Sequence, residues 1–236
     1  MKIKNVETQH TIIFFDIRNF SEHRWRLAEN RRAKLLTKFV REILDKTVEL
    51  LEDRKGEFGM SPPPTLSHTG DGFMLILRGD RNPLLGLLWM SEFRRFVTLR
   101  LKAYEQIISG IFEKDPPKKL GFGIGAHYGK AVPFDFKSFG SSSKTVGFIG
   151  SALNIAARVE QCTKDHVHQV IFTGALRDRV LKIIPPADQK KFEKFWTLLG
   201  QHRLRGFEKP RWLYGFKPGF HIAWKAAAST FPGRFS

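Results

Sequence analysis

Two long stretches with apolar side chains at helical spacing restrict the fold of this chain more than any other feature. They cover residues 24–53 and 83–109 and place many charges between the apolar positions, as expected of amphipathic helices that pack on one side only. A short apolar segment at 10–17 predicts a buried strand before the first helix. A Gly-Asp-Gly turn at 70–72, between two apolar segments, predicts a hairpin before the second. This alternation predicts an α+β protein with helices packed on a mixed sheet.

The rest of the chain predicts connections, short strands and shorter helices. The segments GMSPPPT at 59–65 and KDPPKK at 114–119 read as non-helical connections. The second half begins with a glycine-rich strand at 120–134, a short strand at 145–150 and a helix that is capped by Ser151 and runs to Cys162. A strand at 168–174 follows. The chain then has helical segments within 174–195, interrupted by Pro185 and Pro186, and two closing strands around the loop at 206–210.

The length of 236 residues and a hydrophobic content of 42% suit one domain with a substantial core. We expect this domain at 1–217 and a basic C-terminal tail at 218–236. The single cysteine, Cys162, excludes an internal disulfide and favours a reducing compartment. The apolar run at 11–15 is too short for a signal peptide, and the run at 84–90 is far below the roughly 20 residues that span a bilayer. These features predict a cytoplasmic protein without membrane insertion.

The chain is strongly basic, with 40 Lys and Arg against 23 Asp and Glu and a formal net charge of +17. Such a surface attracts anions, which include nucleotides, nucleic acid and acidic lipid, and the charge alone does not choose among them. The stretch at 18–36 could form a basic helix face, but no zinc-finger, homeodomain or RNA-recognition signature accompanies it. A solvated helix face explains it better than a specific nucleic-acid site.

Two acids in the predicted sheet suggest a metal site. Asp16 ends the strand at 10–17, and Asp71 lies at the tip of the hairpin. If the strands are neighbours, the two carboxylates meet at one edge of the sheet, where a divalent cation such as Mg²⁺ or Mn²⁺ would relieve their repulsion. The alternative is that Asp16 caps the following helix and that Asp71 is an ordinary turn residue.

Two further segments can serve a phosphate-bearing ligand. Backbone N–H groups at Phe20 and Ser21, just after the first acid and at the start of the next helix, are suited to binding phosphate. Asn154 and Arg158 stand four residues apart and therefore project from one helix face. The alternative for this pair is a surface arginine beside an asparagine of poor helix propensity.

The histidines do not form a recognisable zinc motif. His166 and His168 lie two residues apart, and no cysteine or acid is placed to complete a ligand set. His68 lies close to Asp71 in sequence and is a possible substrate contact.

Taken together, five segments resemble the catalytic domain of class III nucleotidyl cyclases, the adenylyl and guanylyl cyclase family. The resemblance covers about residues 10–217 and rests on FFDIRNFS, TGDGFM, GIGAHYGKAV, GSALNIAARVE and LRGFEKPRWLYGF in this order. It implies a ferredoxin-like βαββαβ core and a head-to-tail homodimer. One subunit would supply Asp16, Asp71 and the carbonyl of Ile17 to two Mg²⁺ or Mn²⁺ ions per site. The other would supply Asn154 and Arg158.

The reaction implied by this resemblance is attack of the ribose 3′ oxygen on the α-phosphate of a nucleoside triphosphate. The products are pyrophosphate and a 3′,5′-cyclic monophosphate. Asn154 would orient the ribose and Arg158 would face the charge that grows on the α-phosphate. In the late loop Arg205 replaces the family's usual lysine, with Lys209 nearby, and either cation could bind the terminal phosphates.

The chain departs from the family at the positions that read the base. Counting back four residues from Asp71 gives Ser67, and counting back three from Gly150 gives Gly147, where purine cyclases carry polar readers. Selectivity of this kind comes from polar groups that only the right base can pair. The chain is in this respect similar to the pyrimidine cyclases of bacterial anti-phage defence, which make cyclic UMP or cyclic CMP for a separate effector. The alternatives are an adenylate or guanylate cyclase with unusual readers, and an inactive nucleotide-binding module of the same fold.

Overall fold

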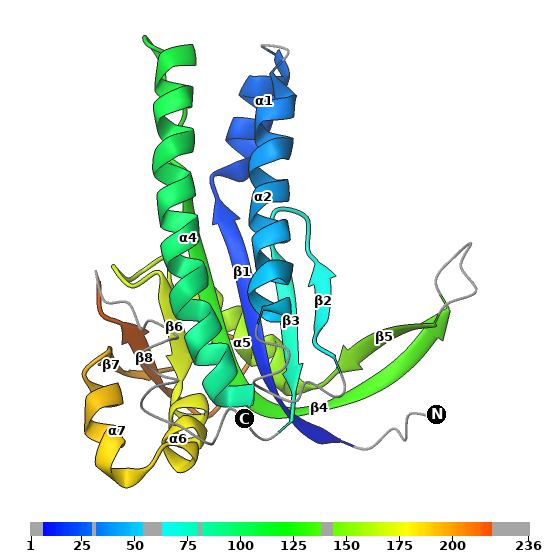
Figure 1. Ribbon diagram of the computed structural model, residues 1–236, viewed down its shortest axis with the longest axis vertical. Coiled ribbons are helices and arrows are strands. Elements are labelled where there is room, and N and C mark those ends of the chain that lie inside the picture. The colour runs from blue at the N-terminus through cyan, green and yellow to red at the C-terminus, as the bar shows by residue number, and fades with distance from the viewer. Residues whose placement is uncertain (1–6, 30–31, 54–62, 80–81, 138–143, 219–236) are drawn as a thin grey trace.

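Strand β1 (Thr8–Arg18) lies inside the sheet, where the computed structural model places it between β3 (Phe73–Arg78) and β4 (Gly121–Lys137) (Figure 1). Both neighbours run antiparallel to β1, and β2 (Thr65–His68) pairs with β3 at the edge. The order β2-β3-β1-β4 is that of the expected ferredoxin-like βαββαβ core. The structure describes these ranges of the chain: 7–29, 32–53, 63–79, 82–137 and 144–218.

The sheet continues beyond β4 into the C-terminal half of the chain. β6 (Val170–Thr173) runs parallel to β4, and β8 (Arg211–Phe216) and β7 (Trp196–His202) follow in antiparallel pairs. β5 (Lys144–Ile149) pairs with the far end of β4 in a hairpin that projects from the body of the molecule (Figure 1). Within the described residues the sheet has eight strands and is mixed, which confirms the predicted fold class.

Helices cover both faces of this sheet. On one face lie α2 (Ala33–Glu52) and α4 (Asn82–Ile111), with α1 (Phe20–Glu29) against α2 and α6 (Gly174–Ile183) against α4. The opposite face is covered by α5 (Ser151–Cys162), which packs on β4, β1 and β6. Among the described residues, several helices therefore cover one face of the sheet and α5 covers part of the other.

Alternation along β1 divides its side chains between these two faces. Ile13, Phe15 and Ile17 enter the larger core, which the helices α2 and α4 share. Phe15 stacks there on Phe73, with ring centroids 5.0 Å apart. Ile12 belongs to a smaller core that includes the buried alanines of α5. The same alternation directs Asp16 away from the large core and toward the face that α5 partly covers.

β4 carries glycine where α5 crosses it. A Cβ added to Gly125 would overlap the backbone of Glu160 and lie 2.7 Å from the carbonyl oxygen of Ala156. A Cβ added to Gly129 would lie 2.9 Å from the Cβ of Ala152. The glycine-rich strand predicted from the sequence is confirmed, and the missing side chains let the helix lie directly on the strand backbone.

The predicted single helix at 24–53 is wrong. The structure has two helices there, because α1 already begins at Phe20 and α2 begins at Ala33. The backbone N–H of Arg32 donates to the carbonyl oxygen of Leu27 at 2.8 Å, at the end of α1. Apolar spacing continues across the break because both helices pack on the same core, and spacing alone therefore does not reveal it.

The predicted cap of α5 is also wrong. Ser151 is the first helical residue, and Gly150 occupies the cap position without a side-chain hydrogen bond. Gly150 has φ +155°, and a Cβ there would lie 3.0 Å from the carbonyl oxygen of Lys130. The start of α5 thus lies close to β4, and a glycine rather than a serine occupies the cap position there. The spacing of residues in the sequence does not show this contact.

The remaining boundaries agree with the sequence. α6 ends before the two prolines, and α7 (Pro186–Glu193) begins at the second of them. The closing strands β7 and β8 flank the predicted loop. The predicted tail lies outside the described residues from 219 onward, as does most of the segment at 59–65.

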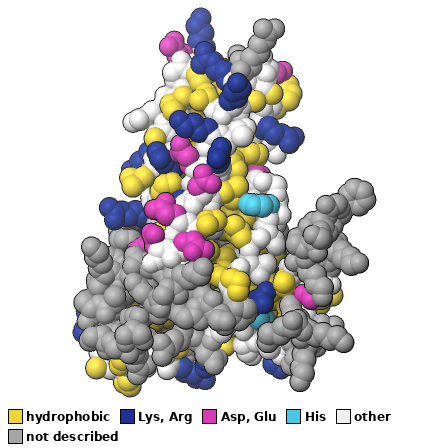
Figure 2. Space-filling model, turned by 45° about the vertical axis from the view of Figure 1, so that its right-hand side comes forward, with side chains coloured by type: hydrophobic (Ala, Val, Ile, Leu, Met, Phe, Trp, Pro, Cys, Tyr) yellow, Lys and Arg dark blue, Asp and Glu magenta, His cyan; other side chains and the backbone are white. Residues whose placement is uncertain are grey.

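Basic and acidic side chains are separated on the face that Figure 2 shows. In the view of Figure 2, Lys and Arg side chains lie over the end of the molecule where α2 begins and α4 ends, and Asp and Glu side chains form a group below them. Among the described residues, none of the helices combines the length and apolar character that crossing a membrane requires.

Candidate active site

Asp16 and Asp71 lie side by side at one end of the sheet. Phe15 faces Phe73 in the register of β1 with β3, so the next positions along these strands bring Asp16 against Gly72. A Cβ added to Gly72 would lie 3.1 Å from the Cα of Asp16. The hairpin turn that carries Asp71 therefore touches the backbone of β1 beside Asp16.

The electrostatics of Asp16 reflect this placement. Burial raises the pKa of Asp16 above its ordinary value, and the neighbouring Asp71 raises it further. Lys164 and Arg18 act in the opposite direction and lower it. A half-buried carboxylate beside a second acid is destabilised in its charged form, and a divalent cation placed between the two would remove this penalty.

Within the part of the chain that the structure describes, the Asp16 carboxylate makes no hydrogen bond or ion pair. Buried polar groups in folded proteins are normally paired. A half-buried acid that is left without a protein partner is thus available for a ligand.

A backbone oxygen is placed next to the two acids. The carbonyl oxygen of Phe15 points toward Gly72 of the turn. Carbonyls two residues apart on a strand point to the same side, so that of Ile17 is directed past Gly72 toward Asp71. The carbonyl ligand at Ile17 stays a prediction.

The start of α1 follows directly on β1. Asn19 takes φ +61°, which turns the chain from the strand into the helix at Phe20. The first N–H groups of a helix have no partner within it, and here they include those of Phe20 and Ser21, which follow Asp16 closely in the chain. Ser21 is exposed and Phe20 is half-buried.

Asn154 and Arg158 lie on the outer face of α5. The inner face packs on the sheet through Ala152, Ile155 and Ala156, whereas Asn154 is exposed. Arg158 is half-buried, and its Nη1 donates to Gln161 Oε1 at 2.7 Å. No hydrogen bond or ion pair joins Asn154 or Arg158 to either acid within the described residues. The predicted residues therefore form two separate groups in one chain.

The two predicted base-reading positions lie on strands. Ser67 of β2 is half-buried and faces Met74 across the strand pair. Gly147 of β5 faces Phe134 of β4, and a Cβ added to Gly147 would lie 2.6 Å from the Cζ of that ring. The ring of Phe134 thus lies against Gly147 in the structure.

Arg205 and Lys209 lie in the segment between β7 and β8. Both are exposed, and neither forms an ion pair with another described residue. Gly206 between them has φ +86°, a conformation that favours glycine. The structure brings neither cation to the two acids within one chain.

The sequence analysis missed a group of side chains between β1 and the end of α5. Arg18 donates from Nη2 to the hydroxyl of Thr163, and Glu160 lies beside them, only 6% exposed. Burial raises the pKa of Glu160 to about 6, with Asp16 as the next contribution and Lys164 and Arg18 acting against it. The available signals were the position of Arg18 two residues after Asp16 and that of Glu160 two residues after Arg158.

Histidine and acid side chains do not gather into a larger metal site. Within the described residues, no group of three or more His, Cys, Asp or Glu side chains could hold a metal ion. His166 packs edge-on against His202 with centroids 5.2 Å apart, and His168 Nδ1 bonds to the carbonyl of Phe216 at 2.7 Å. His68 is exposed at the end of β2.

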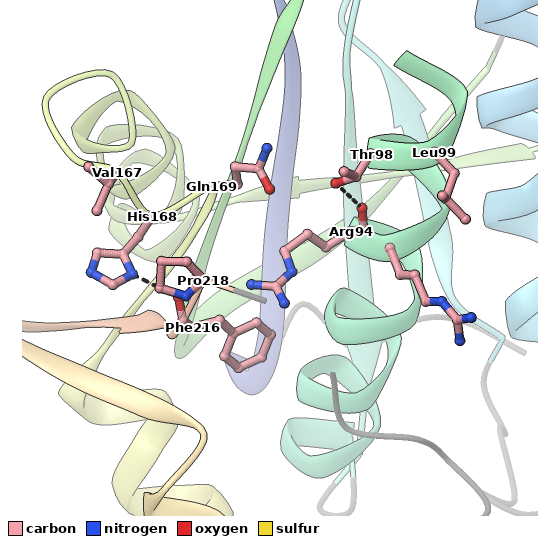
Figure 3. A pocket seen from close by; sticks show the side chains of 9 residues that line it. Arg94, Thr98, Leu99, Val167, His168, Gln169, Phe216 and Pro218 are labelled. Atoms are coloured by element: carbon pink, nitrogen blue, oxygen red, sulfur yellow. Dashed lines mark hydrogen bonds between the residues drawn. The ribbon is translucent and has the colours of Figure 1, made fainter. Parts of the chain in front are cut away.

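A cavity among the described residues is formed by other side chains. A cavity of about 440 Å³ lies between α4, the segment at 167–169 and the end of β8 (Figure 3). Arg94 from α4 and His168 from the facing loop line it, and none of the predicted site residues does. Asp16 and Asp71 lie at the end of β1 and in the turn between β2 and β3.

Solved structures of nucleotide cyclases share this fold. The adenylyl cyclase CyaB from P. aeruginosa matches with a TM-score of 0.64 and 17% identity, over 92% of this chain and 98% of that one. The guanylyl cyclase Cya2 matches with a TM-score of 0.63 and 16% identity, over 93% and 98%. The guanylate cyclase domain of RhGC from Catenaria anguillulae, solved in complex with GTP, matches with a TM-score of 0.53 and 12% identity, over 90% of this chain and 98% of that one.

At these identities the likeness establishes the fold, and it confirms the predicted class III cyclase architecture. No model of a known protein family matches the sequence, and no curated protein matches it either.

Proposed function

We propose that the protein is a nucleotidyl cyclase that converts a nucleoside triphosphate to its 3′,5′-cyclic monophosphate and pyrophosphate. The observation that carries this proposal is the unpaired, half-buried carboxylate of Asp16 beside Asp71, on a fold shared with adenylyl and guanylyl cyclases. The RhGC domain was solved with GTP, and we extend nucleoside triphosphate binding from it to this chain.

The acid pair fits Mg²⁺ or Mn²⁺, and we propose two ions per site. Carboxylate and carbonyl oxygens are the ligands these hard cations prefer, and Asp16, Asp71 and the carbonyl of Ile17 offer them together. Bound ions of this kind lower the pKa of an attacking hydroxyl and neutralise charge on phosphates. Burial and the neighbouring Asp71 raise the pKa of Asp16 and so disfavour its charged form, and a bound cation would relieve this repulsion.

The proposed reaction forms one bond and breaks one. The ribose 3′ oxygen bonds to the α-phosphorus, the bond from that phosphorus to the β-bridging oxygen breaks, and the hydroxyl proton passes to solvent. Asn154 orients the ribose and Arg158 stabilises the charge on the α-phosphate. The N–H groups of Phe20 and Ser21 contact phosphate oxygens, and Arg205 or Lys209 binds the terminal phosphates.

A head-to-tail homodimer would complete the site. In one chain the acids are half-buried at the end of β1 and in the turn after β2, and Asn154 and Arg158 lie on the outer face of α5. A second copy can bring its α5 to the acids of the first, and twofold symmetry then creates two equivalent sites. This arrangement explains why the two groups of residues are separate in the single chain.

We further propose that the base is a pyrimidine, from UTP or CTP. Position 67 offers only the short hydroxyl of a serine, and position 147 is a glycine, which offers no polar side chain. A site that lacks the polar partners of a purine loses the basis for selecting one. By its resemblance to the anti-phage pyrimidine cyclases, the product would be a second messenger for a separate effector protein.

Product analysis tests both the activity and the base. The purified chain is incubated with Mn²⁺ or Mg²⁺ and separately with ATP, GTP, CTP and UTP, and products are identified by mass spectrometry. We expect cyclic UMP or cyclic CMP as the dominant product. Faster conversion of ATP or GTP would support the purine alternative, and no cyclic product from any of the four would indicate an inactive nucleotide-binding module.

Matched variants link the product to the site. Asp16→Asn removes the charge at nearly the same volume and is expected to abolish the product. Asp45→Asn makes the same chemical change on the exposed surface of α2 and is expected to leave the rate unchanged. Equal rates for the two variants would show that the acid pair is not the reaction centre.

A further inference from the structure

The strand that carries Asp16 also carries a potential competitor for the metal. Arg18 lies two residues after Asp16, and side chains at this spacing lie on the same face of a strand. A guanidinium in this position can form an ion pair with the carboxylate. Such a pair would occupy the acid that the proposed function assigns to a divalent cation.

The structure holds the Arg18 side chain elsewhere. Its stem runs along Gly121, where an added Cβ would lie 3.5 Å from the Arg18 Cδ. Its Nη2 donates to the hydroxyl of Thr163, just beyond the end of α5. The guanidinium is thereby held at the end of α5, and within the described residues it forms no ion pair with Asp16.

Thr163 and Glu160 form a fixed receptor for this guanidinium. Thr163 is fully buried, and its hydroxyl also donates to the carbonyl oxygen of Glu160 at 2.6 Å. The Glu160 carboxylate, the Thr163 hydroxyl and the Arg18 guanidinium converge over Gly123. A Cβ added there would lie 3.1 Å from Arg18 Nη2 and would overlap the other two groups. The glycine thus makes room for the contact.

The charges agree with this geometry. Burial lowers the pKa of Arg18, and among the acids that raise it Glu160 comes before Asp16. A buried carboxylate is costly to keep charged unless a cation pairs with it. The buried carboxylate of Glu160 therefore favours the charged guanidinium at the place where Thr163 receives it.

We infer that Glu160 and Thr163 are positioning residues that hold Arg18 under α5 and so keep Asp16 available to a divalent cation. The inference rests on the proposed function, because it takes Asp16 to be a metal ligand. It assigns Glu160 a role in metal binding without direct contact to the metal.

Mn²⁺ binding in the absence of nucleotide tests this role directly. Binding to the purified full-length chain is followed by the loss of the free Mn²⁺ signal in electron paramagnetic resonance. Glu160→Gln keeps the shape and releases the Arg18 charge, so we expect a Kd raised by about tenfold through the charge now near the acids. Arg18→Met combined with Glu160→Gln should return the Kd to within about threefold of wild type.

Melting followed by circular dichroism will show whether Glu160→Gln still folds. If it does not, a second variant tests the same contact. Thr163→Val removes the hydroxyl that receives Arg18 and keeps both charges. We expect a weakening of about threefold, the scale of one lost hydrogen bond, and Arg18→Met should cancel it.

Three results would overturn the inference. Unchanged Mn²⁺ binding in Glu160→Gln and in Thr163→Val would show that neither residue matters to the metal. Equal weakening with and without Arg18→Met would show that Glu160 acts without Arg18. If Asp16→Asn binds Mn²⁺ as wild type does, the metal site itself fails, and the proposed function fails with it. The first two results leave the proposed function standing.

Discussion

Asp16 occupies a position that costs the protein stability. Its neighbours Phe15 and Ile17 are buried in the large core, and the alternation of the strand leaves Asp16 on the other face, half-buried beside Asp71. Nothing in the packing of β1 requires a carboxylate there. Residues that reduce stability are common where function needs them, and Asp16 fits this description.

Asp16→Asn should therefore stabilise the protein while it removes activity. The pKa of Asp16 is raised in the folded state, so its charged form opposes folding, and this penalty grows as the pH rises through the pKa. We expect Asp16→Asn to raise the free energy of unfolding by up to about 1 kcal/mol, kept small because solvent screens a half-buried group. The gain should be larger at pH 8 than at pH 4.

Denaturant unfolding of both proteins in the absence of metal, at the two pH values, measures this effect. Asp45→Asn on the exposed surface of α2 serves as the control and should show no such gain. A lower stability of Asp16→Asn at pH 8 would mean that Asp16 has a structural partner.

At the scale of elements, the contact between α5 and β4 decides the shape of the site. The glycines of β4 let α5 lie on the strand backbone, with Gly125 under Glu160 and Gly129 under Ala152. The inner face of α5 is fixed by this contact, which leaves Asn154 and Arg158 outward. The sequence shows both the glycines and the helix, and their mutual contact appears only in the fold.

Gly125→Ala should lift α5 from the sheet. Its Cβ would overlap the backbone of Glu160, which cannot move as a flexible side chain does, so we expect a loss of about 1–3 kcal/mol in the free energy of unfolding. Gly110→Ala in α4 is the matched control because an added Cβ meets nothing within 4 Å. It should stabilise the protein by about 0.5–1 kcal/mol through helix propensity.

Thermal melting of the two glycine variants compares these effects directly. We also expect Gly125→Ala to lose cyclase activity and Gly110→Ala to keep it. If Gly125→Ala is as stable as wild type, α5 does not pack directly on the backbone of β4 at this position.

At the scale of the whole molecule, the two groups of proposed site residues belong to different surfaces. The acids lie at the end of β1 and in the turn after β2, and Asn154 and Arg158 lie on the outer face of α5. The homodimer proposed above would join them. Neither group of residues is then sufficient for activity without the other, so activity depends on the assembled dimer.

Mixed dimers test this sharing of sites. Asp16→Ala and Arg158→Ala are each expected to be inactive as homodimers. Heterodimers of the two, isolated with different tags on the two chains, retain one intact site of the two and should show about half of the wild-type rate.

Heterodimers of Asp16→Ala with Asp71→Ala provide the control. Both changes would then affect acids that serve the same role, so each site lacks one acid and no activity should return. Recovery in this control, or no recovery in heterodimers of Asp16→Ala with Arg158→Ala, would contradict the shared geometry.

The sequence by itself determined the kinds and the order of the elements, because apolar spacing and turn residues are local signals. It also predicted the acids, the Asn/Arg pair and the resemblance to class III cyclases. The tertiary structure decided what depends on contacts between distant segments: the break between α1 and α2, the glycine at the start of α5, and the placement of Arg18 against Thr163 and Glu160. Residues that are 145 positions apart meet in that last contact, and no local pattern carries such information.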